Sequence, residues 1–146
     1  MSRFRRVVVG ALAVCVASLA LAAPPAQADS VSSYCDDGRP QGYEHYLQGY
    51  AAYSVDGPYH NWYLFSAYFS SGFHTYINDN NDLDIWFHRN GVQMFHEWDN
   101  SVAGYQWKDW WTSQWTLASD HEVTRWKGVF DLPWEGDTHC NVWAET

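Results

Sequence analysis

The chain has 146 residues, and its 17 acidic and eight basic side chains give a net charge of −9 with histidine neutral. A protein this acidic repels polyanions, which argues against nucleic acid and anionic lipid as partners. Aromatic residues make up 18% of the chain, including ten Trp and ten Tyr, and they are interleaved with charged residues. We therefore expect that not every ring is buried.

The N-terminus has the three parts of a secretory signal peptide. An arginine-rich start is followed by an apolar run over residues 7–22, and Ala26-Gln27-Ala28 places small residues where a signal peptidase cleaves. The run is short for a membrane span, and no second one follows. We predict a cleaved signal peptide over residues 1–28 and one secreted domain over residues 29–146. That domain carries five basic and 17 acidic residues, a net charge of −12.

Two cysteines remain in the predicted domain, one near each of its ends. Cys15 lies in the signal, where Val14 is too bulky for an efficient lipoprotein cleavage site. Cys35 and Cys140 would meet an oxidising compartment, so we predict a disulfide between them. They are far apart in sequence and form no C-x-x-C motif, which argues against a redox role.

The first part of the domain gives mixed signals. Residues 29–42 contain several turn formers and are predicted to be an irregular arm. A series of tyrosines over residues 43–53 fits neither the helical nor the strand period, so both conformations stay open. Asp56-Gly57-Pro58 predicts a turn, and the aromatic run over residues 62–69 predicts a strand buried on both faces.

The middle of the chain predicts a three-stranded meander over residues 73–77, 83–89 and 92–97. Asn90-Gly91 is a strong signal for a two-residue hairpin turn. Counting back from that turn places Trp86 opposite Phe95 and Asp84 opposite Glu97. One face of the meander is then apolar. The other face is aromatic and polar and carries His74, Tyr76, Asp84, Trp86, His88, Gln93, Phe95 and Glu97.

The last third of the chain adds further strands. The Trp-rich segment over residues 107–115 fits a helical face but also alternates, and strand with loop is favoured over helix. Residues 122–130 alternate well, and residues 138–144 form a last strand that carries Cys140. The expected fold is all-β: a single antiparallel β-sandwich or barrel-like domain, closed by one disulfide that links its N- and C-terminal segments.

The aromatic-polar face suits carbohydrate, because flat rings pack on the apolar face of a pyranose while polar side chains bind its hydroxyls. The alternative is that residues 107–115 cover these rings and form a second small core. The predicted ligand-binding residues are His74, Tyr76, Trp86, His88, Gln93 and Phe95.

Two weaker sites share Asp84. In the expected register Asp84 and Glu97 are cross-strand neighbours about 5 Å apart, a spacing that a retaining glycosidase uses. Asp79, Asp82 and Asp84 have the oxygen-rich composition of a calcium loop. The EF-hand pattern fails there, however, and turn chemistry alone explains the segment. No other metal or cofactor is expected, because the histidines form no zinc motif.

The sequence thus favours a secreted, non-catalytic domain that binds an extracellular carbohydrate or cell-wall polymer. One alternative is a protein-interaction module, such as an inhibitor of an extracellular enzyme. Another is a small glycan hydrolase that uses Asp84 and Glu97.

Overall fold

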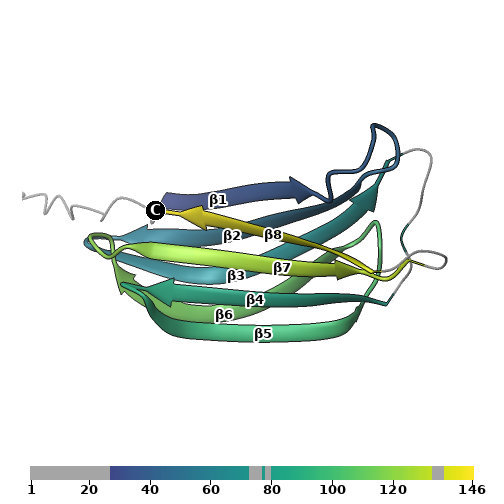
Figure 1. Cartoon of the computed structure of the whole chain (residues 1–146). Helices are drawn as coiled ribbons and strands as arrows, with labels where there is room; N and C mark the ends of the chain where they lie inside the picture. Colours follow the sequence, from purple (N-terminus) through teal and green to yellow (C-terminus); the bar gives the residue numbers. More distant parts are fainter. Residues whose placement is uncertain (1–26, 73–76, 78–79, 133–136) are drawn as a thin grey trace, which may run out of the picture.

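A computed structural model of the protein describes residues 27–72, 77, 80–132 and 137–146. In these residues eight strands form two antiparallel sheets of four, in the orders β1-β2-β3-β6 and β5-β4-β7-β8. The sheets face each other as a sandwich (Figure 1). The predicted all-β sandwich is therefore confirmed. The strands are β1 (Gln27–Asp36), β2 (His45–Asp56), β3 (Tyr59–Ser71), β4 (Asn81–Arg89), β5 (Val92–Val102), β6 (Trp107–Leu117), β7 (Glu122–Phe130) and β8 (Thr138–Glu145). None of the described residues belongs to a helix long and apolar enough to cross a membrane.

Turn chemistry places two of the hairpins as predicted. Asn90 and Gly91 have φ angles of 51° and 78°, the positive values that a type I′ turn requires at both central positions. They join β4 to β5. Gly57 has a φ of 57° and lies in the tight turn between β2 and β3. Both turns connect strands that are neighbours in their sheet.

The N-terminal part of the domain differs from the expectation. Residues 27–36 form an edge strand that pairs with β2 along its whole length, so the predicted irregular arm is wrong there. The inward-facing positions of β1 hold Val31, Ser33 and Cys35, a set too small and polar to read as a core strand. Tyr46, Tyr50 and Tyr53 lie on β2, which settles the open choice in favour of a strand there, whereas Tyr43 precedes the strand. Residues 73–76, most of the first strand of the predicted meander, lie outside the described residues.

The core lies between the sheets and is largely aromatic. A glycine makes the closest packing possible, because a Cβ atom at Gly49 of β2 would come within 2.3 Å of the Trp126 ring on β7. Likewise, a Cβ atom at Gly128 would come within 2.7 Å of the Phe69 ring. The largest fully buried side chains include Trp62, Trp126, Phe65, Phe69, Phe87 and Phe130.

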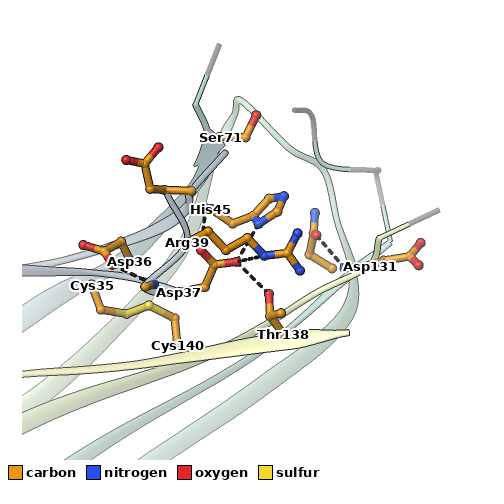
Figure 2. Close-up of polar contacts among 12 residues, drawn as sticks. Cys35, Asp36, Asp37, Arg39, His45, Ser71, Asp131, Thr138 and Cys140 are labelled. Atoms are coloured by element: carbon orange, nitrogen blue, oxygen red, sulfur yellow. Dashed lines mark hydrogen bonds and ion pairs between the residues drawn. A yellow bond between two sulfur atoms is a disulfide. The ribbon is translucent and has the colours of Figure 1, made fainter. Parts of the chain in front are cut away.

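A disulfide and a buried carboxylate join the two sheets at one end of the sandwich (Figure 2). Cys35 of β1 bonds to Cys140 of β8, with the Cα atoms 6.0 Å apart, as predicted. Beside the disulfide, Asp37 accepts hydrogen bonds from His45 Nδ1 at 2.7 Å and from the Thr138 hydroxyl at 3.1 Å. These contacts connect the loop after β1 to the starts of β2 and β8.

A second buried carboxylate joins the sheets at the opposite end. Glu122 begins β7 and is 1% exposed. It accepts hydrogen bonds from His60 Nδ1 at 2.7 Å, from Trp62 Nε1 at 3.1 Å, from the Thr146 hydroxyl at 2.5 Å and from the Thr116 hydroxyl. Since His60, Trp62 and Thr116 belong to the facing sheet, this carboxylate ties β7 to β3 and β6.

Candidate functional site

A β-bulge at Met94, three residues after Gly91, changes the register of the β4–β5 hairpin. His88 pairs with Gln93 as predicted, but Phe87 pairs with Phe95, so Met94 is an inserted residue on β5. The pairs from Phe87 to Leu83 are displaced by one residue, and the side chains of β5 change faces. A second irregularity follows between Leu83 and Asn81.

Two predicted neighbours are separated by this bulge. Asp84 lies opposite Trp98, and Glu97 lies opposite Ile85, which is fully buried. Asp84 and Glu97 therefore point to opposite faces of the sheet. The predicted carboxylate pair is wrong, and with it the geometry on which the hydrolase alternative depended.

Phe95 is a second correction. It faces inward and stacks on Phe65 of the other sheet, with ring centroids 5.0 Å apart. His96 takes the outward position expected for Phe95 and donates a hydrogen bond from Nε2 to Asp84 at 3.1 Å. Of the predicted ligand-binding residues, Trp86, His88 and Gln93 share the outer face of β4 and β5, whereas His74 and Tyr76 lie outside the described residues.

Trp86 already has protein groups stacked on its ring. His96 of β5 is parallel to it, with centroids 5.1 Å apart and an interplanar angle of 3°. The Arg125 guanidinium of β7 lies 5.3 Å from its centroid, a cation–π arrangement. Because β5 and β7 flank β4 on its two sides, His96 and Arg125 both reach the Trp86 ring. Trp86 therefore offers a ligand less free ring surface than an isolated exposed Trp would.

The Trp-rich segment does not cover the outer face of β4, so that alternative is wrong. It forms β6, which pairs with β3 in the opposite sheet. The exposed and half-buried positions of β6 alternate along its length. Trp107, Trp111 and Trp115 are 49%, 71% and 48% exposed and all point outward.

Tyrosines of the neighbouring strands extend this surface. Tyr63 stacks on Trp111 with centroids 6.3 Å apart and an interplanar angle of 18°. Tyr68 lies 5.3 Å from Trp107, and Tyr50 of β2 meets the same indole edge-on at 6.4 Å. We call this surface the β6 aromatic face, and it comprises Tyr50, Tyr63, Tyr68, Trp107, Trp111 and Trp115.

Polar side chains lie between these rings. Asp109 and Ser113 occupy the outward positions of β6 between its tryptophans. Asp109 accepts a hydrogen bond from the Ser66 hydroxyl at 2.7 Å, and the Ser113 hydroxyl donates to Asn61 Oδ1 at 3.3 Å. The surface thus combines flat rings with fixed hydrogen-bonding groups, the mixture that the sequence predicted for the outer face of the meander.

The sequence contained a signal for this face. Residues 107, 109, 111, 113 and 115 alternate between Trp and a small or acidic residue, which is the period of a strand with one exposed side. The tryptophans at positions 107, 110, 111 and 115 also have the spacing of one helical face. This second pattern obscured the strand alternation. Trp110 faces inward and packs against the core.

The two buried carboxylates are enclosed and stay charged. Burial alone would raise the pKa of Glu122, but hydrogen bonds from Thr116, Thr146, His60 and Trp62 hold this pKa below its usual value. Burial likewise opposes ionisation of Asp37, and its bonds with His45 and Thr138 lower its pKa overall. The Asp37 and His45 side chains are 1% and 0% exposed, so this pair serves the fold rather than a ligand.

The calcium prediction is not tested by this arrangement. Asp79 lies outside the described residues, and Asp84 is bonded to His96. Over residues 27–72, 77, 80–132 and 137–146, no three His, Cys, Asp or Glu side chains converge in a way that could hold a metal ion.

Comparisons with protein-family models, with curated proteins and with solved structures give no significant match.

Proposed function

We propose that this protein is a secreted, non-catalytic domain that binds an extended carbohydrate polymer through the β6 aromatic face. The observation that carries the proposal is the line of three outward indoles at every fourth residue of one strand. With a rise of about 3.3–3.4 Å per residue, successive indoles lie about 13 Å apart and the line is about 27 Å long. A row of this length fits several sugar units better than a single one.

The chemistry of the face supports carbohydrate. The flat side of a pyranose is apolar and packs on an indole, while its equatorial hydroxyls bind carboxylate, amide and hydroxyl groups such as Asp109 and Ser113. Exposed apolar surface of this extent on a soluble domain marks a contact site. The disulfide is consistent with an oxidising, extracellular setting.

Retention of the purified domain on insoluble cellulose, chitin and peptidoglycan tests the proposal. Trp111→Ala removes the most exposed ring of the face and should weaken retention at least tenfold, a loss of about 1.4 kcal/mol. The matched control is Trp98→Ala, because Trp98 is 64% exposed but lies on β5 of the other sheet.

The control variant should bind as the wild type does. Equal retention of Trp111→Ala and wild type on every polymer that binds would reject the face. If no polymer retains the wild type, the carbohydrate proposal fails and a protein partner becomes the better interpretation of the exposed rings.

A further inference from the structure

The outer face of the second sheet contains a pocket of about 460 Å³ that lies away from the β6 aromatic face. Val123 of β7 lies at the centre of the pocket. In the strand register it is flanked by His88 of β4 on one side and by Glu145 of β8 on the other. The short valine side chain is surrounded by longer ones, which creates the depression. Arg125, Trp143 and His121 also line the pocket.

The pocket contains Arg125, one of the few basic side chains of an acidic chain. Among the described residues, Arg39, Arg89 and Lys108 each have a carboxylate within 4.0 Å, whereas Arg125 and Lys127 have none. Only Arg125 of these two lines the pocket. His88 and His121 also line the pocket and offer ring nitrogens that can hydrogen-bond a ligand.

The Arg125 guanidinium is held in place but keeps donors available. Its NH2 group donates to Asn141 Oδ1 at 3.0 Å, and its Cζ atom lies over the Trp86 ring, 5.3 Å from the centroid. A guanidinium has five N–H donors arranged as a fork that matches a carboxylate, so one bond to an amide leaves most of them for a ligand.

Trp143 provides the apolar wall beside this charge. It lies opposite Arg125 in the β7–β8 register and is 58% exposed. A ligand that bonds the guanidinium with a carboxylate can therefore lay a ring against the indole. Glu145 also lines the pocket, and its negative charge repels an anionic ligand. His121 Nε2 lies 3.4 Å from this carboxylate.

We propose that this pocket binds a carboxylate-bearing sugar residue of the uronic-acid type, with the carboxylate on Arg125 and the pyranose ring on Trp143. The pocket volume lies within the usual range for small-ligand sites, about 300–1,000 Å³. The site is on the opposite sheet from Trp111, so it goes beyond the proposed function and stands or falls separately from it.

Titration of the domain with glucuronate, glucose and acetate at low ionic strength, followed by NMR of the backbone amides, tests the site. Glucuronate should bind at least tenfold tighter than glucose or acetate and shift the amides of Val123 and Trp143. Equal affinity for glucose would show that the charge contributes nothing. Equal affinity for acetate would show that the ring contributes nothing, and either result, or no binding of glucuronate, overturns the proposal.

Three variants separate a local site from general attraction to positive charge. Arg125→Gln should lower the glucuronate affinity at least tenfold, and Glu145→Gln should raise it two- to threefold. The matched control is Lys127→Gln, which removes the same charge from the same outer face of β7 without touching the pocket. Equal losses in Arg125→Gln and Lys127→Gln would overturn the assignment, while Trp111→Ala should leave glucuronate binding unchanged.

Discussion

Replacing Glu122 with glutamine tests how the buried carboxylate holds the two sheets together. The substitution keeps the shape of the side chain but removes its charge and replaces one acceptor oxygen with an NH2 donor. All four bonds then lose their charge assistance, and the two partners of the former Oε2, His60 and Thr146, must accept instead of donate. A hydrogen bond to a charged group contributes about 1.5–3 kcal/mol and a neutral one about 0.5–1.5, a difference of about 1 kcal/mol each. The amide also costs less to bury, which returns part of the loss. We expect Glu122→Gln to lower the free energy of unfolding by about 2–3 kcal/mol at neutral pH.

The pH dependence of this difference gives the sharper test. The pKa of Glu122 is lowered in the folded state, so its carboxylate stabilises the fold above its unfolded pKa of about 4.3. This contribution is lost as the pH falls through the lower folded pKa. The glutamine variant has no such group, so wild type and variant should approach each other in stability under acid.

Urea denaturation followed by tryptophan fluorescence measures both quantities, from about pH 7 down to about pH 3. The control is Glu145→Gln, because Glu145 is exposed and its carboxylate, among the described residues, bonds only with His121, at 3.4 Å. Its effect should be within about 0.5 kcal/mol. Two results would show that the Glu122 carboxylate does not hold the sheets together: equal stability of Glu122→Gln and wild type at neutral pH, or a deficit of Glu122→Gln that is the same at acid pH.

Two further predictions concern the core and the disulfide. Gly49→Ala should destabilise the fold by about 1–3 kcal/mol, because its new methyl group would overlap the Trp126 ring. Combined with Trp126→Leu, the two losses should be less than additive. Strict additivity of the two losses in urea denaturation would contradict the clash. Replacing both Cys35 and Cys140 with serine should cost about 4–5 kcal/mol, since the bridge closes a loop with a sequence separation of 105. Alkylation of the wild-type domain without reductant should label neither cysteine, and a free thiol would disprove the bridge.

The fold was predictable where local chemistry and the hydrophobic period agree. Asn90-Gly91 fixed a turn, residues 122–130 alternated cleanly, and two cysteines in one predicted domain left a single pairing. The edge strand β1 was missed because its outer face is solvated and its inner face contains small residues. Ser33, for example, lies opposite Gly49, where Trp126 fills the space. No residue in β1 signals that contact, since it depends on the facing sheet.

The candidate site was less predictable, because a single inserted residue decides which way a strand faces. Met94 is apolar and sits where alternation expects an inward residue, so the sequence gives no local mark of the bulge. Its effect moves Phe95 into the core and His96 out of it. The β6 aromatic face was hidden for another reason: its tryptophans fit two periods at once, and only pairing with β3 distinguishes them.

The position of the disulfide also determines how the domain responds to tension. A force applied between residues 27 and 146 passes through Cys35 and Cys140 and bypasses the chain between them. Only 14 described residues lie outside the bridge, so the oxidised chain lengthens by at most about 50 Å, against roughly 400 Å for the 120 residues from 27 to 146 when reduced. Strand β6 and the tryptophans on it lie within the bypassed segment. An oxidised domain stretched between two attachment points would therefore keep that surface folded while its terminal strand ends peel away.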